Sequence, residues 1–108
     1  EFIKLYTRNV RAIFELKPVT QKVLQYLLVA IQKTPNADGI YLAWLDAEKY
    51  FGEEHIKVSR TSFQRSLREL IQKEFIAEST SPNLYWFNPH LFFNGDRMTF
   101  IREYRLRR

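Results

Sequence analysis

Polar and basic side chains recur along one side of the segment 59–74 at helical spacing, about 100° per residue. This polar face comprises Thr61, Gln64, Arg65, Arg68 and Gln72. The opposite face is apolar and comprises Phe63, Leu67, Leu70 and Ile71. Arginine can pair with guanine through two hydrogen bonds, and glutamine can pair in the same way with adenine. We therefore expect Thr61, Gln64, Arg65 and Arg68 to read base edges in double-stranded DNA.

A second group of residues has the chemistry of phosphate contacts. These residues lie near the start of the same helix and in a later turn, and they are Lys57, Ser59, Arg60, Ser81 and Asn83. Ser59 is a good N-cap, and the free amides and dipole at a helix start favour an anion. The turn at 79–83 contains no Lys or Arg, so its contacts would come from hydroxyl and amide donors.

The charge distribution favours a polyanionic partner more than the total charge does. The chain has 108 residues, with 17 basic and 12 acidic side chains and a net charge of +5. The segments 1–22, 59–74 and 97–108 are net basic, whereas 23–58 and 75–96 are net acidic. Such a bipolar surface can steer a protein toward DNA. The alternative is that these are solvated faces without a partner, because any surface helix can carry Arg and Gln on its exposed side.

Hydrophobic periodicity predicts the elements that position these residues. We expect helices at 8–14, about 19–33, 47–51 and about 59–74, and strands at 40–42, 75–78 and 84–87. Residues 2–7 should form a short strand or an extended arm, and residues 98–106 a basic helix or, alternatively, an extended strand. Pro18 should end the first helix and open the second, since proline fits a first helical turn. Asp46 is the expected N-cap of the third helix, and Gly52 is its expected end.

This order of elements predicts an α+β fold of the winged helix-turn-helix type, mostly helical with a small antiparallel wing hairpin. The recognition helix at about 59–74 would enter the major groove, with the wing at about 76–87 beside it. The length suits one domain, so residues 1–108 are predicted to form a single winged-helix DNA-binding domain. Because residue 1 is Glu, we also expect a longer protein around this segment.

The aromatic residues divide into expected core and surface positions. Tyr41 and Trp44 are predicted to lie in the core. Tyr85, Trp86 and Phe87 should alternate between core and surface. The exposed one would pack in a dimer interface or stack on an unpaired base.

Signals for enzymes, cofactors and membranes are weak. His55 and His90 have no partner at metal-ligand or catalytic spacing, and the chain has no cysteine and only three glycines. These counts argue against thiolate metal sites and glycine-rich phosphate loops. No apolar run reaches the ~18 residues of a membrane span. We expect no catalytic residue, metal, cofactor, small-molecule substrate or membrane partner; the expected partners are double-stranded DNA and a second copy of the chain.

Several of these segments also resemble a known family, the plasmid replication initiators of the RepL-like, winged-helix type. The likeness covers nearly the whole chain, and it rests on Phe2 to Tyr6, the Leu27-Leu28 helix, Thr61 to Ile76, and Tyr85 to Arg97. The run Asn-Pro-x-Leu-Phe-Phe-x-Gly-Asp-Arg from Asn88 to Arg97 is its distinctive part. The resemblance implies a cytoplasmic protein of a bacterial plasmid or phage that binds origin or operator DNA. It also implies an ion pair between Asp96 and Arg97.

We therefore expect a sequence-specific double-stranded DNA-binding protein, in particular a replication initiator domain that binds origin DNA. Two alternatives stay open. One is a winged-helix transcriptional repressor, which uses the same DNA chemistry. The other is a winged-helix protein-interaction module that does not bind DNA, in which the aromatic hairpin and the terminal helices contact a partner.

Overall fold

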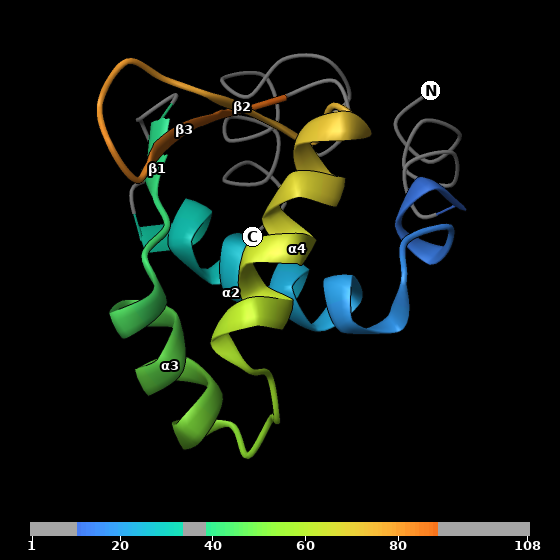
Figure 1. Cartoon of the computed structure of the whole chain (residues 1–108), viewed down its shortest axis with the longest axis vertical. Coiled ribbons are helices and arrows are strands. Elements are labelled where there is room, and N and C mark those ends of the chain that lie inside the picture. The colour runs from blue at the N-terminus through green and yellow to red at the C-terminus, as the bar shows by residue number, and fades with distance from the viewer. Residues whose placement is uncertain (1–10, 34–38, 89–108) are drawn as a thin grey trace, which may run out of the picture.

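The computed structural model describes residues 11–33 and 39–88 and combines helices with one small sheet (Figure 1). The elements are helix α2 (Pro18–Lys33), strand β1 (Gly39–Tyr41), helices α3 (Trp44–Glu53) and α4 (Arg60–Gln72), and strands β2 (Ile76–Glu78) and β3 (Leu84–Phe87). Residues 11–14 are also helical. This order confirms the predicted α+β class and winged-helix fold. The strand expected at 2–7, the helix expected at 98–106, His90 and the Asp96–Arg97 pair lie outside the described residues.

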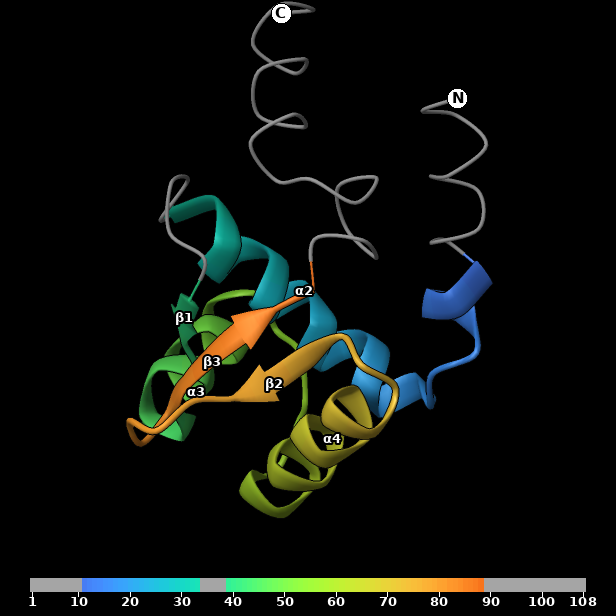
Figure 2. The same ribbon diagram turned by 90° about the horizontal axis from the view of Figure 1, so that it is seen from above.

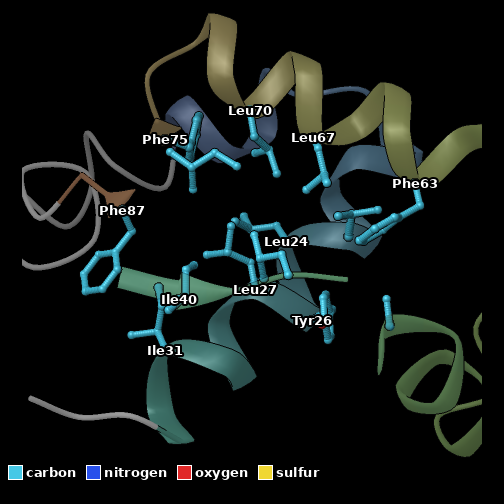
Figure 3. Close-up of a cluster of buried hydrophobic side chains, with 14 of the residues drawn as sticks. Leu24, Tyr26, Leu27, Ile31, Ile40, Phe63, Leu67, Leu70, Phe75 and Phe87 are labelled. Atoms are coloured by element: carbon cyan, nitrogen blue, oxygen red, sulfur yellow. The ribbon is translucent and has the colours of Figure 1, made fainter. Parts of the chain in front are cut away.

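Helix α2 forms the centre of the core because its apolar residues recur at three- and four-residue steps. Val23 and Leu27 are fully buried, and Leu24 is nearly so. Figure 3 shows Phe63, Leu67 and Leu70 of α4 pointing toward the side chains of α2. Pro18 opens α2 as predicted, because its ring fits the first turn and its missing N–H is not needed there.

The predicted hairpin is part of a three-stranded antiparallel sheet with strand order β1-β3-β2 (Figure 2). Ile40 lies opposite Tyr85, and Ile76 lies opposite Phe87. Ile40, Ile76 and Phe87 are buried, so this face of the sheet closes the core. The other face carries Tyr41, Leu84 and Trp86, since side chains alternate along a strand.

The predicted boundaries of the third helix are wrong. Helix α3 begins at Trp44, after Ala43 at the N-cap position, and no side chain caps it. Asp46 lies in the first turn of α3, where its carboxylate accepts a hydrogen bond from Tyr26. Gly52 is inside the helix, and the chain reverses instead at His55, whose φ is 58°.

The prediction that Tyr41 lies in the core is also wrong, because 58% of its surface is exposed. In β1 the buried residue is Ile40, and alternation turns the next side chain outward. Trp44 is partly buried against the core, with its ring 5.7 Å from that of Phe63. The alternation in β3 is confirmed, since Trp86 is exposed and Phe87 is buried.

Candidate nucleic-acid interface

Helix α4 begins where the sequence predicts, at a capped N-terminus. The Ser59 hydroxyl accepts a hydrogen bond from the backbone N–H of Ser62 at 3.1 Å, which satisfies one of the free amides of the first turn. The helix ends at Gln72, and Glu74 then reverses the chain with a φ of 64°. The Asn88 side-chain amide donates to the Glu74 carbonyl at 2.9 Å, which ties this reversal to the end of β3.

The apolar face of α4 determines which of its residues reach solvent. Phe63 and Leu70 are fully buried and Leu67 is 3% exposed, so the opposite face must point away from the core. The residues on that face are all exposed: Thr61, Gln64, Arg65, Arg68 and Gln72. All four predicted base-reading residues therefore share one solvent-facing surface, which we call the α4 face.

The α4 face is electropositive, because its arginines form no ion pair with a described carboxylate. Within residues 11–33 and 39–88, the structure has one salt bridge, between Lys73 and Glu69 at 3.2 Å. Arg60, Arg65 and Arg68 have no carboxylate partner in that part of the chain. Their guanidinium groups thus keep all their donors for a ligand.

Glu69, the acidic residue of α4, is turned away from the α4 face. Its carboxylate accepts hydrogen bonds from the Thr20 hydroxyl and from the Lys17 backbone N–H, and it pairs with Lys73. Burial by itself would raise the pKa of Glu69, but these donors outweigh burial and hold the pKa below its usual value. The negative charge of Glu69 is therefore balanced by these donors, so it does not repel an anionic ligand on the α4 face.

The predicted phosphate contacts fall into two groups. Lys57, Ser59 and Arg60 are exposed around the start of α4, whereas Ser81 and Asn83 are exposed in the turn between β2 and β3. This turn is held by its own hydrogen bonds. The Ser79 hydroxyl accepts from the Ser81 N–H at 3.0 Å, and the Asn83 carbonyl accepts from the Leu42 N–H at 2.9 Å.

The turn also shows why Asn83 suits its position. Its φ is 63°, a left-handed conformation that asparagine tolerates better than most residues. The side chains of Ser81 and Asn83 make no hydrogen bond to other described residues, so both remain available to a ligand. The structure thus brings the base-reading candidates together on α4 and places Ser81 and Asn83 apart from them, in the turn between β2 and β3.

A groove of about 380 Å³ between α2, β1 and α3 was not predicted from the sequence. Tyr26 and Asp46 line it, joined by a hydrogen bond of 2.7 Å from the tyrosine hydroxyl to Asp46 Oδ2. Burial, and next the hydrogen bond to Asp46, raise the pKa of Tyr26. Tyr41 and Tyr50 also line this groove. The sequence pattern gives no sign of this groove, because its walls form only when α2, β1 and α3 pack against one another.

Searches for other kinds of site give negative results in the part of the chain that the structure describes. No group of three or more His, Asp or Glu residues there could hold a metal ion. None of the helices there combines the length and the apolar character needed to cross a lipid bilayer.

Comparison with known proteins finds a relative in Zymomonas mobilis subsp. mobilis, named "20.9 kDa protein", that is 32% identical over 103 residues. The match covers 93% of this chain and 56% of the relative, so the chain spans little more than half the length of this curated relative. No protein-family model matches the chain, and no solved structure matches it.

Proposed function

We propose that the chain binds double-stranded DNA in a sequence-specific manner, with α4 in the major groove and the β2–β3 wing beside it. The observation that carries this proposal is the α4 face, where Gln64, Arg65 and Arg68 are exposed together and the arginines lack a carboxylate partner among the described residues. A winged-helix fold presents the corresponding helix to the major groove.

The spacing of the two arginines suits neighbouring base pairs. Arg65 and Arg68 are separated by about 4.5 Å along the helix axis, at 1.5 Å per residue. Successive bases along one strand are about 3.4 Å apart, so each arginine can meet a different base. Thr61 precedes Arg65, and Gln64 precedes Arg68, by roughly one turn, so both would contact adjacent positions.

Phosphate contacts would supply most of the affinity. Lys57, Ser59 and Arg60 surround the start of α4, where a phosphate oxygen would also meet the free amides of the first turn. If about six phosphates are neutralised, the logarithm of the binding constant falls with the logarithm of salt concentration with a slope of about −5.

A matched pair of double variants tests this proposal. Fluorescence anisotropy would measure binding of a labelled random duplex at low salt. Arg65→Gln with Arg68→Gln should weaken binding at least about tenfold, whereas Lys22→Gln with Lys33→Gln, on α2, should change it by less than about twofold. Both pairs remove the same charge, so equal weakening would contradict a DNA surface on α4, and no binding by the wild type would contradict the whole proposal.

The replication role is proposed on the resemblance described above. Sequences selected from a random DNA pool would contain direct repeats for an initiator that binds repeated origin sites, and a palindrome for a dimeric repressor. The outer sheet face favours a second candidate, a protein-interaction module, because Trp86 and Tyr41 are 48% and 58% exposed there. Such a module would leave the random duplex unbound.

A further inference from the structure

A cluster of polar groups joins the start of α2 to the second half of α4, and we call it the α2–α4 clip. It consists of Lys17, Thr20, Ser66, Glu69 and Lys73. Thr20 and Ser66 are each 1% exposed, and they are the polar residues that are fully buried in the described part of the chain. Their hydroxyl oxygens lie 3.2 Å apart, and the Thr20 hydroxyl also donates to Glu69.

The remaining contacts of the clip are two hydrogen bonds to backbone groups and one ion pair. The Lys17 N–H donates to Glu69 Oε2 at 3.2 Å, at the start of α2. The Lys73 ammonium binds the same carboxylate oxygen at 3.2 Å and the Glu15 carbonyl at 3.1 Å. Three separate points on the segment 15–20 are therefore attached to α4.

The rest of the interface between the two helices is apolar, with Leu24 and Leu27 of α2 facing Phe63, Leu67 and Leu70 of α4 (Figure 3). Apolar contacts fix the rotation of α4 coarsely, because they keep its apolar face against α2, but they are not directional and leave room for small rotations. Hydrogen bonds depend on distance and angle, and a clip made of them can fix that rotation.

The clip residues are adjacent in sequence to the arginines of the α4 face. Ser66 follows Arg65 and Glu69 follows Arg68, so each clip residue points about 100° away from its arginine. A rotation of α4 by about 20° would move a side chain at the helix surface by about 2 Å. That displacement exceeds the tolerance of a base-edge hydrogen bond, whose length varies by only about 0.5 Å.

We propose that Thr20 and Glu69 are positioning residues for DNA discrimination: they fix the rotation of α4 so that Arg65 and Arg68 meet the correct base edges. This inference rests on the proposed DNA-binding function and extends it to residues that touch no DNA. Phosphate contacts tolerate small rotations because charge attraction is independent of sequence and only weakly directional, whereas a bidentate base contact needs a defined geometry. Loss of the clip should therefore reduce specificity and leave non-specific affinity almost unchanged.

Thr20→Val tests the clip most cleanly, since it removes the hydroxyl, keeps the side-chain shape and alters no charge. The readout is the ratio of dissociation constants for a shuffled duplex and for a duplex selected by the wild type, both measured well below the melting temperature. We expect this ratio to fall about tenfold, within the discrimination of one bidentate base contact, while the shuffled duplex binds as before. Thr20→Ser retains the hydroxyl and should restore the ratio.

Glu69→Gln provides a second measurement on the other helix, and it serves if Thr20→Val fails to fold. Glu69→Gln should lower the same ratio of dissociation constants. Its amide cannot form the ion pair with Lys73, and it has no second acceptor oxygen for the Lys17 N–H. Glu48→Gln, an exposed position on α3, is the matched charge control and should leave the ratio unchanged. A wild-type ratio in both clip variants would overturn the positioning role, whereas a wild type that binds no duplex would overturn the proposed function itself.

Discussion

The Tyr26 hydroxyl donates a hydrogen bond to Asp46 Oδ2 at 2.7 Å and so joins the middle of α2 to the first turn of α3. The Tyr26 ring also packs 6.0 Å from the rings of Phe51 and Phe63, on α3 and α4. One side chain therefore contacts both helices of the helix-turn-helix unit. The hydrogen bond replaces the capping role that the sequence suggested for Asp46.

Tyr26→Phe removes this hydrogen bond and keeps the ring. We expect a loss of about 1.5–3 kcal/mol in the free energy of unfolding, because a hydrogen bond to a charged group contributes about that much. Urea unfolding monitored by circular dichroism would measure it. Tyr50→Phe is the matched control, since the Tyr50 hydroxyl has no hydrogen bond to other described residues, and an equal loss there would refute the role of the Tyr26–Asp46 bond.

Ser59 has two roles that substitutions can separate. Ser59→Ala removes the N-cap of α4 and should cost about 1 kcal/mol of stability. Ser59→Asp keeps a capping acceptor and should retain stability, but its negative charge should weaken DNA binding several-fold if a phosphate lies there. Thermal melting and duplex binding, measured on both variants, would check this. Wild-type DNA affinity of Ser59→Asp would exclude Ser59 as a phosphate contact.

Substitution of Leu70 and of Leu45, one buried and one exposed, tests where the core of the protein lies. Leu70 is fully buried and Leu45 is 78% exposed. Leu70→Ala should lower the free energy of unfolding by about 2–5 kcal/mol, whereas Leu45→Ala should change it by less than about 0.5 kcal/mol. Denaturant midpoints of the two variants would show the difference, and similar losses would contradict the arrangement of α4 against α2.

Acid should weaken the fold partly through Glu69. Its pKa is lowered in the folded protein, so its contribution to stability is complete above the usual pKa of about 4.5 and is lost as the pH falls through the folded value. Between about pH 5 and pH 3, Glu69→Gln should therefore lose less stability than the wild type. Unfolding curves of the wild type and of Glu69→Gln at several pH values would test this, and identical slopes for the two proteins would contradict it.

The sequence predicts α4 and its exposed face well because the information is local. Ser59 marks the start, and a regular alternation of apolar and polar residues over three turns determines which face is buried. The wing is predicted for the same reason, since Ser79 to Asn83 contain only turn-forming residues between two apolar runs.

The errors concern features that depend on distant partners. Asp46 could cap a helix locally, but its carboxylate binds Tyr26, which is 20 residues away. The chain reverses at His55 with a positive φ, which histidine adopts more often than most residues, but Gly52 is the stronger local signal for a helix end. In the short strand β1, a shift of one residue exchanges the two faces, so three residues are too few to predict that Tyr41 faces outward. Two clip partners of Glu69, Thr20 and Lys17, lie 49 and 52 residues away and leave no pattern in the sequence.

The measurement that tests DNA reading by α4 most directly is selection of bound duplexes from a random pool by the wild type and by Arg68→Ala. We expect the wild type to enrich a defined sequence, and Arg68→Ala to lose about 1–3 kcal/mol of binding free energy with relaxed preference at one base position. Enrichment of no sequence by the wild type, or uniform weakening by Arg68→Ala without relaxed preference, would contradict it.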